Sequence, residues 1–170
     1  MNIASNPWSF VSADVVTAAP SASPTGLISS AGGVVAYSGA AFAPVPGNFV
    51  TIIGATNAAY NGFYKVIAGG SGGTTATLYS DKLRYAGTVL AASGGGTVIK
   101  NQYQLMVRAE DMYWLNATAA AECIVLDRNG NLVWDAIAPT TGNYSRSKPY
   151  WIFGLTIQAL PSGTLTVTVN

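Results

Sequence analysis

Short runs of β-branched and aromatic residues recur along this chain, and glycine, asparagine and proline separate them. Asn48–Ile53, Phe63–Ala68 and Thr74–Tyr79 are such runs in the first half. Asn61-Gly62 and the glycine-rich tip Gly69–Gly73 lie between them and predict turns. Strands at this spacing are typical of all-β domains. We therefore expect short antiparallel strands forming a barrel, a jelly roll or a sandwich.

The second half continues the pattern. Cys123–Leu126 and Leu132–Ile137 flank an Asp-Arg-Asn-Gly sequence, residues 127–130, that suits a type I turn and predicts a hairpin. The last strand, Gly163–Asn170, alternates valine or leucine with threonine, which predicts one buried face and one face in contact with water or a partner. Ala117–Ala121 is the one stretch rich enough in alanine to support a helical turn.

The proline positions suggest how the chain is divided. Residues 1–30 carry little charge and contain Pro7, Pro20 and Pro24, so we expect an extended N-terminal arm. Residues 31–170 are expected to form a single β domain whose halves, 31–100 and 101–170, share one core. Trp8 and Phe10 lie two residues apart, so a strand directs both to one face. That face either enters a groove of a partner or packs on the chain's own core.

Charge is scarce in this sequence. Charged residues make up 9% of 170 residues and the formal net charge is +1, whereas a typical soluble domain carries about 25% charged residues. A chain with so little charge has a weak field for attracting nucleic acid or an anionic membrane. Neither an apolar run long enough to span a bilayer nor a basic signal-peptide start is present. We expect no nucleic-acid or membrane partner and synthesis in a host cytoplasm.

The residue types needed for catalysis or metal binding are few. The chain has no histidine and one cysteine, Cys123, which lies in an apolar run and is expected to be a small buried hydrophobe. Asp127, Asn129 and Asn131 alternate like the start of a calcium loop, but the glycine and glutamate required later in such a loop are missing. Nothing favours Glu122 and Asp135 as a glycosidase pair. We expect no enzymatic activity, no metal and no cofactor.

Residues 48–99 carry an ordered set of three features. A β-branched strand ends in Gly54-Ala55 and leads to Tyr60-Asn61-Gly62, a threonine-rich strand covers 74–79, and a glycine-rich exit covers 91–98. This set resembles a small β-module of bacteriophage virion and tail-associated proteins. The opening, residues 6–10, is similar to the start of small phage head proteins. The resemblance implies a structural protein of the virion.

The leading hypothesis is a decoration or cement protein on the capsid surface of a phage, binding the major capsid protein and stabilising the assembled shell. Self-association into a dimer or trimer is also expected, because an exposed alternating strand such as Gly163–Asn170 seeks an edge partner. The alternative is a head-fibre or tail-fibre module that binds a host receptor or glycan, with Trp114, Trp134 and Trp151 as a sugar platform. The residues expected to contact a partner are Trp8, Phe10, Tyr144, Arg146, Lys148, Tyr150 and Trp151.

Overall fold

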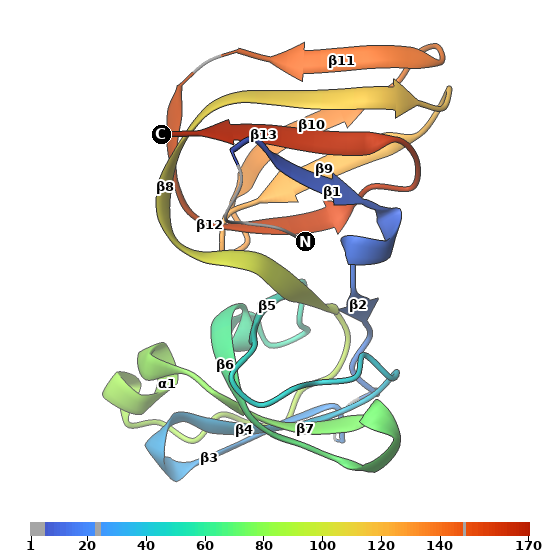
Figure 1. Ribbon diagram of the computed structural model, residues 1–170. Helices are drawn as coiled ribbons and strands as arrows, with labels where there is room; N and C mark the ends of the chain where they lie inside the picture. The colour runs from blue at the N-terminus through green and yellow to red at the C-terminus, as the bar shows by residue number, and fades with distance from the viewer. Residues whose placement is uncertain (1–5, 23–24, 148) are drawn as a thin grey trace. The chain divides into compact units, whose positions relative to one another are not determined.

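The computed structural model describes residues 6–22, 25–147 and 149–170, and its strands pair antiparallel throughout (Figure 1). The expectation of an all-β, antiparallel fold is confirmed. The main strand order is β10-β9-β12-β8-β5-β6-β7-β4-β3, an open path. The chain divides into two compact units: unit 1 comprises Met1–Val15 and Gln102–Asn170, and unit 2 comprises Val16–Asn101.

Unit 2 is built from short strands and tight turns. Its strands are β2 (Thr17–Ala18), β3 (Leu27–Ser30), β4 (Val34–Ser38), β5 (Phe49–Ile53), β6 (Gly62–Gly69), β7 (Thr75–Tyr79) and the start of β8 (Thr97–Ala117). Its helices are α1 (Asp81–Ala86) and the 3-10 turns η2 (Ala31–Gly33), η3 (Ala58–Tyr60) and η4 (Ser71–Gly73). Its core contains three tyrosines, Tyr37, Tyr60 and Tyr64, among aliphatic side chains.

Unit 1 holds most of β8 and the remaining strands. They are β1 (Trp8–Val11), β9 (Glu122–Leu126), β10 (Leu132–Ile137), β11 (Gly142–Arg146), β12 (Tyr150–Ala159) and β13 (Thr164–Val169), with the 3-10 turn η1 (Ser12–Asp14). Strand β8 is 21 residues long, so the expectation of uniformly short strands fails there. Trp114 is fully buried at the centre of this core and donates its indole N–H to the carbonyl of Ser162 at 2.8 Å.

The domain arrangement differs from the expected arm and single core. The buried side chains form two separate clusters, one in each unit. The N-terminal segment is part of both units, because β1 pairs with β13 in unit 1 while β2 pairs with β8 in unit 2. The boundary inside β8, between Asn101 and Gln102, lies one residue from the expected division between the two halves.

Several local expectations can be compared with the structure. The hairpin β9–β10 is confirmed: the Gly130 amide donates to the Asp127 carbonyl at 3.1 Å. Strands β5 and β6 pair as expected, but Asn61-Gly62 is not their hairpin turn, because residues 54–61 form a longer connection that includes η3. The Asn61 side chain instead accepts the Ala55 amide at 2.9 Å.

The α-helix of the described residues lies outside the alanine-rich stretch Ala117–Ala121. Residues 118–121 form no helix, and the short helix is α1, which sequence reasoning missed. Gly87, with φ +64°, ends α1 in a left-handed conformation. Ser80 and Asp81 at its start and Gly87 at its end were the sequence signals that could have predicted this helix.

Candidate protein-contact surface on β8 and β12

The residues expected to contact a partner fall into three groups in the structure. Trp8 and Phe10 are 4% and 0% exposed and belong to the core of unit 1. The Trp8 ring packs at 4.5 Å from the ring of Tyr103. The expectation that these two side chains anchor in a partner is therefore wrong, because pairing of β1 with β13 directs both to the chain's own interior.

Tyr144 and Arg146 on β11 are half-buried and make internal contacts. The Tyr144 hydroxyl donates to the Thr140 carbonyl at 2.6 Å, and its ring lies 5.9 Å from that of Trp114. Arg146 donates to the carbonyl of Val133 and lies over the Tyr150 ring at 5.1 Å. Both residues support the structure of unit 1 more than they offer a free surface. Lys148 lies outside the described residues.

Tyr150 and Trp151 are exposed at the start of β12. Three further apolar side chains, on β8 and β12, are also exposed, and the sequence analysis did not predict them. We call the following set the β8–β12 surface: Leu105 (64% exposed), Met106 (52%), Tyr150 (45%), Trp151 (60%) and Phe153 (48%). Leu105 and Met106 are adjacent apolar residues in a strand, so the alternation of side chains predicts that at least one of them faces outward, and this was the available signal.

The two strands that carry this surface are neighbours in the sheet. Gly154 of β12 lies so close to β8 that a Cβ atom there would be 2.7 Å from the Tyr103 carbonyl oxygen. Three residues further on, the Ile157 amide donates to the side-chain oxygen of Gln102 at 2.8 Å. These contacts place residues 153–157 of β12 alongside residues 102–104 of β8, next in sequence to the exposed Leu105 and Met106.

Arg128 fixes the orientation of Phe153. Its backbone amide donates to the Phe153 carbonyl at 2.7 Å, and its guanidinium donates to the Gln104 carbonyl at 3.0 Å. The same guanidinium lies 5.5 Å from the centre of the Phe153 ring. An aromatic side chain held in this way loses little conformational entropy when a partner covers it.

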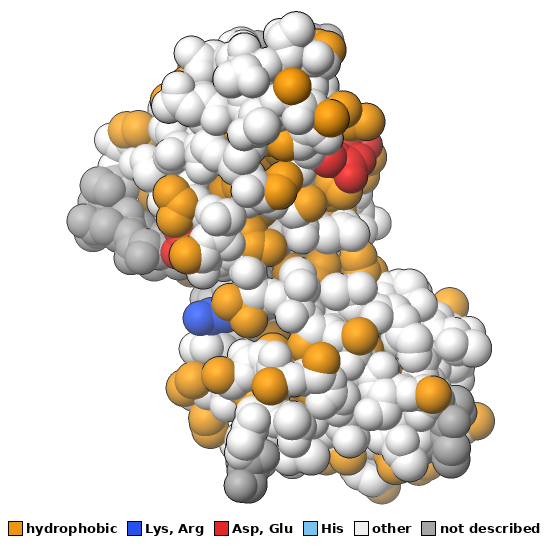
Figure 2. Space-filling model, turned by 90° about the vertical axis from the view of Figure 1, so that its right-hand side faces the viewer, with side chains coloured by type: hydrophobic (Ala, Val, Ile, Leu, Met, Phe, Trp, Pro, Cys, Tyr) orange, Lys and Arg blue, Asp and Glu red, His pale blue; other side chains and the backbone are white. Residues whose placement is uncertain are grey.

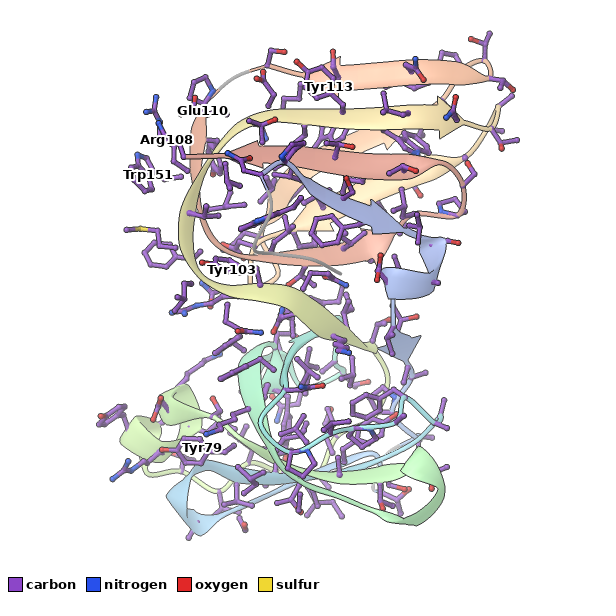
Figure 3. All side chains as sticks on the ribbon, viewed as in Figure 1. Tyr79, Tyr103, Arg108, Glu110, Tyr113 and Trp151 are labelled. Carbon is purple, nitrogen blue, oxygen red and sulfur yellow. The ribbon has the colours of Figure 1, made fainter. Side chains whose placement is uncertain are left out.

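One salt bridge borders the surface. Arg108 and Glu110 lie 3.2 Å apart on β8, and Figure 3 shows both with Trp151 at the edge where β8 curves. Exposed pairs of this kind contribute about 0–1 kcal/mol to stability. Their position is that of a polar rim around an apolar centre, the arrangement found in protein interfaces.

The expected glycan platform does not form. Trp114 is 0% exposed, so it cannot stack on a sugar, and Trp134 is half-buried against the core of unit 1. Of the three tryptophans proposed for that role, Trp151 alone is exposed. The face drawn in Figure 2 carries scattered hydrophobic side chains and few charged ones.

Cys123 and Asp127 each have a structural role. Burial raises the pKa of the Cys123 thiol to about 12, with a smaller contribution from Asp135, so the thiol is protonated at neutral pH. Cys123 is buried as expected. The Asp127 carboxylate accepts the amides of Asn129 and Asn131 at 2.8 and 2.9 Å. Within the described residues no cluster of three or more metal-binding side chains forms.

The described part of the chain contains no helix with the length and hydropathy of a membrane span. No protein-family model, no curated protein and no solved structure matches this chain.

Proposed function

We propose that this protein is a non-enzymatic structural component of a bacteriophage particle that binds the assembled capsid through its β8–β12 surface. The observation that carries the proposal is this surface, where five large apolar side chains are each 45–64% exposed. Contiguous exposed apolar patches of soluble proteins mark sites of interaction with other molecules. The resemblance of residues 48–99 to a phage virion module supports the choice of partner.

The composition of the surface suits a protein partner. It combines Trp151, Phe153 and Tyr150 with a flexible methionine, and three arginines border it: Arg108, Arg128 and Arg146. Tryptophan, tyrosine and arginine are the residues that contribute most at protein interfaces. Covering about 100 Å² of a half-exposed ring contributes about 2.5 kcal/mol at roughly 25 cal/mol per Å².

Repetition on a capsid makes such contacts effective. A protein that binds the assembled shell and not free subunits stabilises the shell by mass action. Every equivalent position on the shell offers the same site. A surface with modest affinity for one site therefore still increases the resistance of the whole shell to heat or denaturant.

The test is cosedimentation with purified shells of the phage that encodes the chain. The wild-type protein is expected to bind with fixed stoichiometry and to raise the temperature at which the shell dissociates. The variants Trp151→Ser and Phe153→Ser are each expected to weaken binding at least about tenfold, because each removes an aromatic contact worth more than about 1.4 kcal/mol.

The matched control is Ile67→Ser. Ile67 is 44% exposed on β6 of unit 2, outside the β8–β12 surface, so this change is expected to leave shell binding unchanged. Failure of the wild-type protein to bind shells would overturn the proposal, as would wild-type binding by both aromatic variants. Binding to host cells in place of shells would instead support the fibre alternative.

A further inference from the structure

The two units differ in the sign of their charge. Unit 2 contains four positive residues and one negative residue, Asp81, which makes +3. Unit 1 contains four positive and six negative residues, which makes −2. The net charge of the chain is therefore near zero because the charges of its two units have opposite signs.

The positive charge of unit 2 is concentrated near α1. We call the following exposed set the basic face: Lys65, Lys82, Arg84 and Tyr85. Lys65 on β6 lies opposite Tyr79 on β7, and the Tyr79 hydroxyl contacts both Arg84 at 3.2 Å and Asp81 at 2.8 Å. Figure 3 shows Tyr79 beside α1. These contacts bring the side chains of α1 to the same end of unit 2 as Lys65.

In the part of the chain that the structure describes, no carboxylate lies within salt-bridge distance of the cations of this face, although Asp81 of the same helix attracts Arg84. Among the described residues, the one salt bridge joins Arg108 to Glu110 in unit 1. The carboxylate of Asp81 accepts the Tyr79 hydroxyl, and Lys82 contacts the carbonyls of Ala59 and Asn61 at 3.4 and 3.1 Å. Tyr85 is 83% exposed and lies next to Arg84. The face thus combines positive charge with an uncovered aromatic ring.

Unit 1 carries a face of opposite charge on β9 and β10. Asp135 pairs with Ile124 and Ile137 pairs with Glu122, so all four side chains lie on one side of the hairpin. We call these four residues the acidic face. Ile137 is 63% exposed, Asp135 is exposed and Glu122 is half-buried. Cys123, between them in sequence, points to the opposite side and is buried in the core.

We propose that the basic face of one copy binds the acidic face of a second copy, giving an assembly of identical chains. Each face pairs charge with an exposed apolar side chain, Arg84 with Tyr85 and Asp135 with Ile137. Complementary charge sets the orientation, and burial of the apolar side chains supplies affinity. Because every copy carries both faces, the contact is either reciprocal within a dimer or repeated from copy to copy, and sedimentation distinguishes the two by the size of the assembly.

The proposed contact between copies uses side-chain faces, whereas the sequence predicted pairing through the edge of the last strand. The last strand, β13, was expected to seek an edge partner, but it pairs with β1 on one side and β8 on the other. It has no free edge to offer. The two oppositely charged faces offer self-association a route that does not depend on the edge of β13.

Sedimentation of the isolated full-length protein tests the proposal by charge reversal. The wild type is expected to form assemblies at low salt that dissociate as ionic strength rises, because the Debye length falls to about 10 Å at 0.1 M salt. Arg84→Glu and Asp135→Lys are each expected to weaken assembly at least about tenfold. The double variant, in which the two charges are exchanged, is expected to recover most of that loss.

Lys100→Glu is the matched control. It makes the same change of charge in unit 2 on an exposed residue outside the basic face, and it is expected to assemble like the wild type. A wild type that remains monomeric at low salt would overturn the proposal, and so would a double variant that assembles no better than the single ones. The experiment uses no capsid, so its outcome is independent of the shell-binding test.

Discussion

Unit 1 and unit 2 use the same antiparallel strands but fill their interiors differently. The core of unit 2 contains tyrosines whose hydroxyls are all used: Tyr64 donates to the Tyr60 carbonyl at 2.7 Å, and Tyr37 donates to the Ala40 carbonyl at 2.8 Å. The core of unit 1 is organised around Trp114 and aliphatic side chains. The core of unit 2 therefore contains hydrogen-bonded phenols, whereas the largest fully buried side chain of unit 1 is the indole of Trp114.

The units also differ in what they expose. The β8–β12 surface of unit 1 leaves aromatic side chains uncovered, whereas the basic face of unit 2 presents charge around one tyrosine. The proposed shell contact uses unit 1 alone, whereas the proposed contact between copies uses one face of each unit. All four tryptophans lie in unit 1. Tryptophan fluorescence therefore follows the unfolding of unit 1 and not that of unit 2.

The largest expected effect comes from removing the centre of the unit 1 core. Trp114→Ala is expected to destabilise unit 1 by about 3–5 kcal/mol, because it creates a cavity and leaves the Ser162 carbonyl without its donor. Urea unfolding followed by tryptophan fluorescence measures this loss. Hydrogen exchange of unit 2 is expected to change far less. Equal loss of protection in both units would contradict the view that the two cores are separate.

A smaller loss is expected at the point where β12 passes β8. Gly154 has φ +72°, and a Cβ atom there would lie 2.9 Å from the Cβ of Arg128. Gly154→Ala is expected to cost about 1–3 kcal/mol of stability in unit 1 through backbone strain. Gly142→Ala is the control, since no atom lies within 4 Å of its added methyl group. Similar unfolding midpoints for the two variants would refute this account of Gly154.

A smaller loss of stability is expected from removing the hydroxyl of a buried tyrosine in unit 2. Tyr64→Phe removes the donor to the Tyr60 carbonyl and is expected to cost about 1 kcal/mol. Hydrogen exchange should show this loss in unit 2 alone. A loss of protection confined to unit 1 would contradict the comparison.

The same phenols make unit 2 sensitive to alkali. Burial raises the pKa of Tyr37 from 10.0 to about 12. The folded state therefore binds the proton more tightly than the unfolded state. This stabilisation is complete below pH 10 and is lost as the pH rises through about 12. In urea unfolding followed by circular dichroism, Tyr37→Phe should lose less stability than the wild type as the pH rises from 10 to about 12.

Much of the fold was predictable from local sequence. The hairpin β9–β10 was predicted because Asp127 and Gly130 specify their own turn, and the pairing of β5 with β6 followed from neighbouring β-branched runs. The Asn61-Gly62 prediction failed because the Asn61 side chain satisfies the Ala55 amide inside a longer connection. Helix α1 was missed because six residues show too little of the helical period.

The candidate site was predictable only in part. Tyr150 and Trp151 were identified from their aromatic and basic surroundings, and both are exposed. Trp8 was also predicted to be accessible to a partner. Whether it is buried depends on the pairing of β1 with β13, which is more than 150 residues away along the chain. The strands that carry Leu105 and Phe153, β8 and β12, became neighbours through the same kind of long-range pairing.

The sequence by itself determined that the chain forms antiparallel strands, where many of its turns fall and how little charge it carries. These properties depend on residues close together along the chain, through backbone sterics, alternation and composition. Only the tertiary structure decided that there are two cores, which aromatic residues are buried, and that charge is segregated by unit. Those properties arise when strands far apart in sequence pair, because pairing selects which face of each strand is covered.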